Sequence, residues 1–327
     1  MRGREAFYVA TGAPVPPGAD AVVKVEEVRA EGDSISVTRQ IPRWKNIVPT
    51  GQDVRKGAEI IQKGEVVNPA GIALLIAAGK RSLSVIRAPR IGILSTGDEL
   101  APLGEERSGK KINNYSNMIA GYLAEAGAVP VPLGVAGDSS ELILRSVESN
   151  IGNLDGLVTI AGSSVGRRDS TAGALLQVRE SREVFHGIRM VPIRPAGLYL
   201  VRGKPVILLP GHCVAAALSF LLVGRPVVTL LSGLGVDSRA ATLNAMLSQG
   251  VSNPRPIGCL FLVRLAAAGG RYSAAPLPWG SNLISSLVKA NAFLELKPRQ
   301  ALEAGQEVTV ELLGSQELSR VTRRRVV

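Results

Sequence analysis

One short segment of the chain combines two hydroxyls, a glycine and two adjacent carboxylates: Ser95-Thr96-Gly97-Asp98-Glu99. It ends the apolar run 90–95, which has the pattern of a buried strand. Carboxylates at the end of a strand can bind Mg²⁺ beside a substrate phosphate, or act as general acids and bases. The structural alternative is a helix start, with Asp98 as the N-cap and Glu99 in the first turn, where the helix dipole favours negative charge.

A second candidate is the run of small residues Ala161-Gly162-Ser163-Ser164-Val165-Gly166, which follows the apolar run 156–160. Small residues let backbone N–H groups approach an anion, and serine hydroxyls add donors. Arg167, Arg168 and Asp169 come next, and two guanidiniums suit a phosphate or an oxyanion. No Gly-Lys-Ser/Thr follows, so the run is not a Walker loop, and a tight turn is the structural alternative.

The third candidate, Pro210-Gly211-His212-Cys213, joins an apolar run to a helical pattern. Backbone amides at the start of that helix would form an anion site, and Cys213 would gain thiolate character there. A Cys–His nucleophilic pair is disfavoured, because adjacent side chains rarely orient for proton transfer. The structural alternative is that His212 or Cys213 only occupies the turn.

The elements that carry these segments alternate between strand and helix patterns. Strands are expected over residues 90–95, 128–133, 156–160 and 205–209, and helices over 116–126, 139–149 and 214–223. This alternation predicts an α/β domain with a mainly parallel sheet, whose carboxyl edge collects ligands. The three candidates and the segment 134–138 all fall at that edge.

Short β patterns flank the α/β region. We expect a β-rich start with strands at 8–11, 21–25 and 34–38, and a helix that opens at Asn68-Pro69 and ends before Gly79. Strands at 258–265, 271–275, 292–296 and 307–312 predict a small β-barrel or sandwich. The expected domains are therefore residues 1–87, 88–232 and 238–314, followed by a basic tail over 315–327.

Composition excludes several classes of protein. Hydrophobic residues make up 46% of the 327 and charged residues 20%, which indicates a folded chain. No apolar run reaches about 18 residues, so we expect no transmembrane helix. Two cysteines and two histidines fit neither a disulfide framework nor a zinc site, which favours a reducing, cytoplasmic compartment. The net charge of +11 would attract anions, but no nucleic-acid-binding module is recognisable.

Several segments occur in a specific order along nearly the whole chain. They are Thr11-Gly12-Ala13-Pro14, residues 17–23, Gly51-Gln52-Asp53-Val54, residues 93–100, residues 162–166 with Asp169, residues 184–187, residues 204–206, residues 209–211 and residues 281–291. This succession resembles the molybdopterin molybdenumtransferase family, MoeA and the E domain of gephyrin-like proteins.

The resemblance implies both a fold and an activity. The fold would be a three-layer, Mog-like α/β molybdopterin-binding domain between a β-rich N-terminal region and a small C-terminal β-barrel. The activity would be the last step of molybdenum cofactor synthesis: molybdate or tungstate is inserted into adenylylated molybdopterin, and AMP is released with the help of Mg²⁺. The family also implies a homodimer, with its cleft between two subunits. The composition and the lack of a recognisable module separately predict no nucleic-acid or membrane partner.

Family roles carry over to particular positions. The catalytic carboxylates would be Asp98, Glu99, Asp138 and Asp169, with Asp98 and Glu99 as Mg²⁺ ligands. The substrate-binding residues would be Ser95, Thr96, Gly97, Gly162, Ser164, Gly166, Arg194, Pro210, Gly211 and Ser285 (or its neighbour Ser286), with Thr11 and Asp53 reaching the cleft from the other subunit.

Some family positions differ. The family's Lys-Pro-Gly-Lys-Pro is Val191-Pro192-Ile193-Arg194-Pro195 here, so its first cation is absent, and its Pro-Gly-Asn-Pro is Pro210-Gly211-His212-Cys213. The family also has a longer N-terminal region with an Asp-Gly-Tyr/Phe-Ala segment. We therefore expect a divergent sequence that has a misassigned start, is a fragment of a longer chain, or is a shortened member. Two functions remain open: an insertase, or a non-catalytic paralogue that binds molybdopterin or a nucleotide, or forms a heterodimer that scaffolds a full-length insertase.

Overall fold

The computed structural model describes residues 5–105, 109–160, 170–234, 241–268 and 270–314. The chain divides into two compact units, formed by the described residues of 1–63 with 67–81 and of 64–66 with 82–327.

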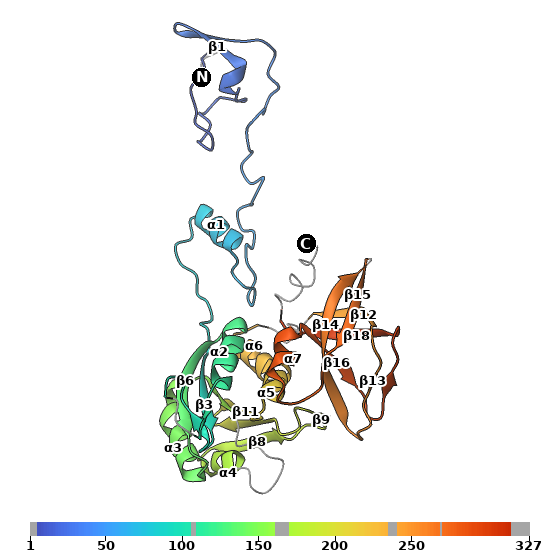
Figure 1. Cartoon of the computed structure of the whole chain (residues 1–327). Coiled ribbons are helices and arrows are strands. Elements are labelled where there is room, and N and C mark those ends of the chain that lie inside the picture. Colours follow the sequence, from blue (N-terminus) through green and yellow to red (C-terminus); the bar gives the residue numbers. More distant parts are fainter. Residues whose placement is uncertain (1–4, 106–108, 161–169, 235–240, 269, 315–327) are drawn as a thin grey trace. The chain divides into compact units, whose positions relative to one another are not determined.

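The first unit holds little regular structure (Figure 1). A 3₁₀ turn, η1 (Val25–Glu27), leads into an antiparallel hairpin of β1 (Val28–Glu31) and β2 (Ser34–Val37). The predicted strand at 34–38 is confirmed by β2, whereas the predictions of strands at 8–11 and 21–25 are wrong. Those segments lie between Gly and Pro turns and pair with no strand among the described residues.

Helix α1 (Pro69–Ala77) is confirmed, and its sequence explains both ends. The Asn68 side chain accepts a hydrogen bond from Gly71 N–H at 2.7 Å, and Pro69 starts the helix where no N–H is needed. Gly79 follows the helix with φ +76°, a left-handed conformation that favours glycine.

The second unit contains a six-stranded sheet in the order β6 (Val129–Ala136), β3 (Arg90–Thr96), β7 (Gly156–Ile160), β11 (Lys204–Leu209), β10 (Gly197–Val201) and β8 (Ser181–His186). The first four strands are parallel, as predicted, and β10 and β8 extend the sheet in antiparallel fashion. These two strands were not predicted.

Helices cover both faces of this sheet (Figure 1). Leu94 of β3 packs with Val147 of α3 (Ser140–Asn150) and Leu175 of α4 (Ser170–Gln177). On the other face, Ile93 packs with residues of α2 (Tyr115–Glu125), α5 (Cys213–Ser219) and α6 (Arg225–Leu231). Alternate residues of one strand thus enter two cores, which gives the expected three layers.

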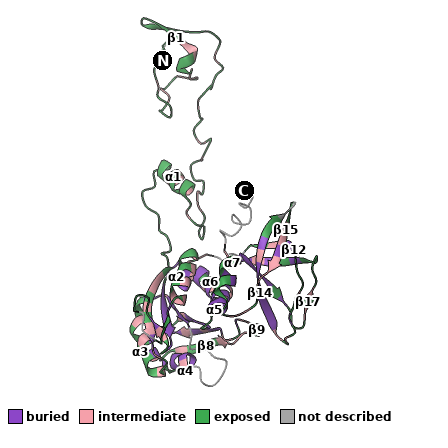
Figure 2. Cartoon of the chain, in the orientation of Figure 1, coloured by how far each residue is buried: buried purple, intermediate pink, exposed green. Residues whose placement is uncertain are grey.

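Helices α5 and α6 run on through the π-helical turn η3 (Phe220–Gly224) as one 19-residue helix, Cys213–Leu231. By length and composition this helix could cross a membrane, so the expectation that no segment reaches that length is wrong. Polar residues break the apolar run in the sequence, but the helix continues through them. Because 61% of the 18-residue apolar stretch of this helix is buried, it is a core helix of this unit (Figure 2).

The C-terminal strands close into the predicted barrel. Their order is β15 (Arg271–Pro276), β12 (Thr242–Leu247), β18 (Glu307–Leu312), β16 (Ala292–Leu296) and β14 (Gly258–Ala268), and β14 also pairs with β15. Strand β9 (Met190–Val191), from the α/β part of the chain, joins β14 in parallel. Smaller elements are η2 (Ile151–Asn153), the pairs β4 (Leu100–Ala101) with β5 (Lys111–Ile112) and β13 (Val251–Ser252) with β17 (Ala301–Leu302), and α7 (Ile284–Lys289).

Candidate active site at the carboxyl edge of the sheet

Two carboxylates that lie far apart in the sequence meet at the ends of β3 and β6. Asp98 N–H donates to Oδ2 of Asp138 at 3.2 Å, and Asp138 N–H donates to Oδ1 of Asp98 at 3.3 Å. Both residues are exposed. Each carboxylate therefore has one oxygen held by its partner's backbone and a second oxygen outside this reciprocal pair.

Glu99 follows in a tight turn, not in a helix. Leu100 N–H donates to the Gly97 carbonyl at 3.2 Å, and β4 begins directly afterwards. The helix-start alternative for Asp98 and Glu99 is therefore wrong. Gly97 has φ +148°, which L side chains rarely adopt, and a Cβ there would lie 2.6 Å from Oε2 of Glu99, so a side chain at this position would strain the turn and displace this carboxylate.

The two hydroxyls before the turn lie inside the fold. Ser95 Oγ donates to Oδ1 of Asn113 at 3.0 Å, and both side chains are buried. The hydroxyls of Thr96 and of Thr159, on the neighbouring strand β7, are buried with no hydrogen-bond partner in the described part of the chain. Buried hydroxyls without partners are uncommon in proteins, which makes this end of the sheet a place where a polar ligand group would be stabilised.

The second candidate segment lies outside the described residues. Its expected site residues are Gly162, Ser164, Gly166 and Asp169, together with Arg167 and Arg168. The elements on either side are β7, which ends at Ile160, and α4, which begins at Ser170.

The turn after β11 differs from the expectation. Pro210 is buried and Gly211 is exposed, but the amide of Val214 at the start of α5 already donates to the Ser281 carbonyl at 3.0 Å. One of the amides expected to bind an anion is thus occupied by a barrel residue. The His212 ring also faces the barrel, with Nδ1 3.0 Å from Ser281 Oγ.

The Cys213 thiol is fully buried, and burial raises its pKa above the ordinary value. Nearby backbone amides and the neighbouring Tyr115 hydroxyl lower this pKa but do not outweigh burial. The prediction of thiolate character for Cys213 is therefore wrong, because desolvation disfavours the charged form.

The Lys-to-Val difference at position 191 has a packing explanation. Val191 lies in β9, pairs with Cys259 of β14 and packs against the apolar core of the barrel. At the position of the family's first cation, this chain thus has an apolar side chain that packs against the core of the barrel. Arg194 is exposed in the following loop, where its carbonyl accepts from Ile188 N–H at 3.0 Å.

Burial distinguishes the two barrel serines. Ser286 is buried, and its hydroxyl donates to the Pro278 carbonyl at 3.1 Å. Ser285 is exposed on α7. Of the pair, Ser285 is the one that a ligand could reach.

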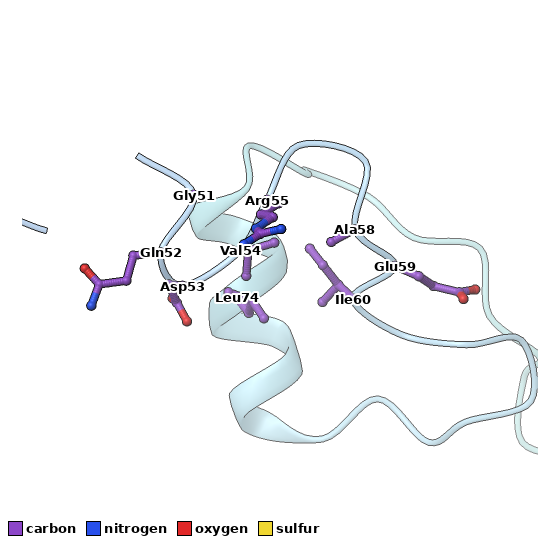
Figure 3. A pocket seen from close by; sticks show the side chains of 9 residues that line it. All are labelled: Gly51, Gln52, Asp53, Val54, Arg55, Ala58, Glu59, Ile60 and Leu74. Carbon is purple, nitrogen blue, oxygen red and sulfur yellow. The ribbon is translucent and has the colours of Figure 1, made fainter. Parts of the chain in front are cut away.

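Thr11 and Asp53 lie in the first unit, and both are exposed. Asp53 lines a hollow of about 390 Å³, in which Gln52 and Asp53 lie at one end and Glu59 at the other (Figure 3). The lining residues are Gly51, Gln52, Asp53, Val54, Arg55, Ala58, Glu59, Ile60 and Leu74.

The carboxylate pair suits Mg²⁺ only together with a substrate. No group of three or more His, Cys, Asp or Glu side chains among the described residues could hold a metal ion. Mg²⁺ is usually bound by one or two carboxylates with substrate phosphates and waters. Asp98 and Asp138 fit that donor set, and the role of Glu99 as a ligand beside Asp98 stays a prediction.

A molybdopterin molybdenumtransferase from Bacillus subtilis is 30% identical to the chain over 316 residues, which cover 94% of this chain and 73% of the relative. The chain belongs to the molybdopterin molybdenumtransferase (MoeA) family. Three family models agree: "MoeA N-terminal region (domain I and II)" matches residues 1–79, "Probable molybdopterin binding domain" residues 92–249, and "MoeA C-terminal region (domain IV)" residues 245–313.

Other MoeA relatives add detail. Molybdopterin molybdenumtransferase 2 from Mycobacterium tuberculosis is 32% identical over 255 residues, and the match spans 76% of this chain but 63% of that relative. A solved MoeA structure from Pyrococcus horikoshii OT3 has a TM-score of 0.69 and 27% identity, and covers 93% of this chain and 74% of that one. The resemblance and the fold class predicted from the sequence are thus confirmed.

Sequence reasoning missed Asn113, Thr159 and Ser281. Asn113 lies 18 residues after Ser95, and its side-chain oxygen accepts the hydrogen bond of the Ser95 hydroxyl. Thr159 lies within the apolar run 156–160, whose pattern predicted only a buried strand. Ser281 belongs to a segment that the resemblance did include, but nothing in the spacing showed its contact with His212.

Proposed function

We propose that this chain inserts molybdate, or tungstate, into adenylylated molybdopterin and releases AMP. The observation that carries the proposal is the reciprocal Asp98–Asp138 pair beside Glu99 at the carboxyl edge of the sheet. The names of the relatives support it, and the retained carboxylates favour an enzyme over a non-catalytic paralogue.

Each carboxylate has a role in this proposal. Asp98 and Asp138 would hold Mg²⁺ through the oxygens outside their mutual pair, and the ion would neutralise charge on the pyrophosphate. Glu99 would accept the proton of the water that attacks the AMP phosphorus, as a general base. Thr96, Gly97, Gly211, Arg194 and Ser285 would bind and orient the anionic pterin.

We further propose a cytoplasmic homodimer, with Thr11 and Asp53 completing the cleft of the other subunit. Helix α1 supports an interface, because none of its residues is buried and Ile72 and Ile76 are exposed by 49% and 66%. An apolar helix face of this kind is stabilised by covering it. We also propose that residues 1–87, 88–232 and 238–314 are the domains.

AMP release tests the proposed function. With adenylylated molybdopterin, Mg²⁺ and molybdate, we expect the protein to release AMP, and Glu99→Gln or Asp138→Asn to slow release by about 100-fold or more. Glu295→Gln removes an exposed barrel carboxylate and should leave the rate unchanged. Absence of AMP release by the wild-type protein, or equal rates in all variants, would refute the assignment.

A further inference from the structure

Two consecutive barrel residues are bonded to the α/β domain at the carboxyl edge of its sheet. Ser281 Oγ lies 3.0 Å from Nδ1 of His212, and the Ser281 carbonyl accepts from Val214 N–H at 3.0 Å. Oδ1 of the next residue, Asn282, accepts from the Tyr115 hydroxyl at 2.9 Å. Three hydrogen bonds thus connect one barrel segment to the starts of α2 and α5.

The bond to Val214 shows that the barrel caps α5. His212 is the N-cap residue, but its side chain makes no capping hydrogen bond. A capping side chain usually accepts from the second or third N–H of the helix, and Val214 is the second residue of α5. The Ser281 carbonyl takes that role, while the His212 ring bonds to the Ser281 side chain.

The barrel segment, residues 278–283, is also anchored to the barrel itself, although Trp279 is 39% exposed. The Arg255 guanidinium stacks 4.3 Å from the ring centroid of Trp279, and Trp279 Nε1–H donates to the Leu260 carbonyl at 3.2 Å. The space left between this segment, Pro192 and Val214 is about 10 Å³, no more than one water needs. The segment therefore has a defined place, and small changes in its anchors would move it relative to the sheet edge.

We propose that His212 is a positioning residue whose Nδ1 atom, through Ser281, holds residues 278–283 as one wall of the pterin site. The inference rests on the proposed function, because only a substrate at the carboxyl edge would sense this wall. According to this proposal, only one atom of the His212 ring is needed to hold the segment. That atom is Nδ1, which lies two bonds from Cβ. Either direction of the hydrogen bond satisfies this requirement, since a serine hydroxyl can donate or accept.

A matched pair of variants separates the two ring nitrogens. Asparagine carries its polar atoms at the same distance from Cβ as Nδ1, and its amide can donate or accept. Glutamine places its amide near the position of Nε2 instead. His212→Asn should therefore keep the bond to Ser281, and His212→Gln and Ser281→Ala should lose it.

Two readouts follow these variants in the full chain. The chain has two tryptophans, so a Trp44→Phe background leaves Trp279 as the single reporter of the segment. We expect His212→Gln and Ser281→Ala to increase iodide quenching of Trp279 and to raise the KM for adenylylated molybdopterin by about fivefold, the effect of one modest hydrogen bond. His212→Asn should match the wild-type protein, and kcat should change less than about twofold in all variants.

Thr309→Ala is the control, because it removes an exposed bond of equal length, 3.0 Å to Asn244, elsewhere in the barrel. Unchanged quenching in His212→Gln and Ser281→Ala would overturn the inference, as would increased quenching with an unchanged KM, or a His212→Asn variant that behaves like His212→Gln. If the wild-type protein releases no AMP, the proposed function fails, and the quenching of Trp279 still reports whether His212 holds the segment.

Discussion

At the scale of single residues, Asp155 shows how the fold uses a charge away from the proposed site. Arg87 donates to both carboxylate oxygens of Asp155, at 2.6 and 2.8 Å, and Arg90 N–H donates to Oδ2 at 2.7 Å. The hydrogen bond from Arg87 is the main cause that lowers the pKa of Asp155, and partial burial acts in the opposite direction. Solvent screens the pair, because the Arg87 side chain is 67% exposed.

This lowered pKa makes a pH-dependent prediction. The interaction of ionised Asp155 with Arg87 contributes fully to the free energy of unfolding above the pKa of an unfolded Asp, about 3.9. This contribution is lost as the pH falls through the lower pKa of Asp155 in the folded state. We expect Asp155→Asn to lower the urea midpoint at neutral pH, and its difference from the wild-type protein to shrink below about pH 4. A difference that stays constant into stronger acid would contradict the role of Arg87.

At the scale of elements, the long helix Cys213–Leu231 contains one close contact at its π-helical turn. A Cβ at Gly224 would lie 2.5 Å from Cδ2 of Phe220, whose ring stacks on Tyr122 with centroids 6.0 Å apart. The Gly224 backbone therefore lies close to the ring of a core aromatic residue. The sequence predicted a helix over 214–223 but not this turn, since the turn depends on packing between two helices.

Gly224→Ala should destabilise the protein by about 1–3 kcal/mol, because the added methyl overpacks a filled core. Gly121→Ala is the matched control: Gly121 is exposed on α2, with nothing within 4 Å of an added Cβ. That variant should stabilise the helix by about 0.5–1 kcal/mol. Thermal unfolding measures the change in stability of both variants. Equal effects of the two substitutions would show that the Phe220 ring can move to make room for the added methyl.

At the scale of the whole molecule, the two units differ in burial. No described residue before position 88 is buried, whereas all four apolar core clusters lie between Ile91 and Leu313. The second unit therefore contains the cores that make unfolding cooperative.

Residues 82–327 alone should unfold in one cooperative transition, with a Tm within about 5 °C of that of the full chain. Differential scanning calorimetry of the two proteins measures this. Loss of the cooperative transition in the shorter protein would show that the first unit stabilises the second. The same shortened protein should lack AMP release if Thr11 and Asp53 complete the cleft as proposed.

The sequence by itself determined the local structure and the family. Runs such as 91–94 and 156–160 form strands because nearly all of their residues are apolar on both faces. Asn68-Pro69 starts a helix because the Asn68 side chain accepts from an early amide and Pro69 has no N–H to satisfy. Only the tertiary structure decided which polar groups meet. Asp98 reaches Asp138, and His212 reaches Ser281, because the sheet order and the barrel closure bring them together. Such contacts between distant residues depend on packing in three dimensions, which the spacing of residues along the chain does not contain.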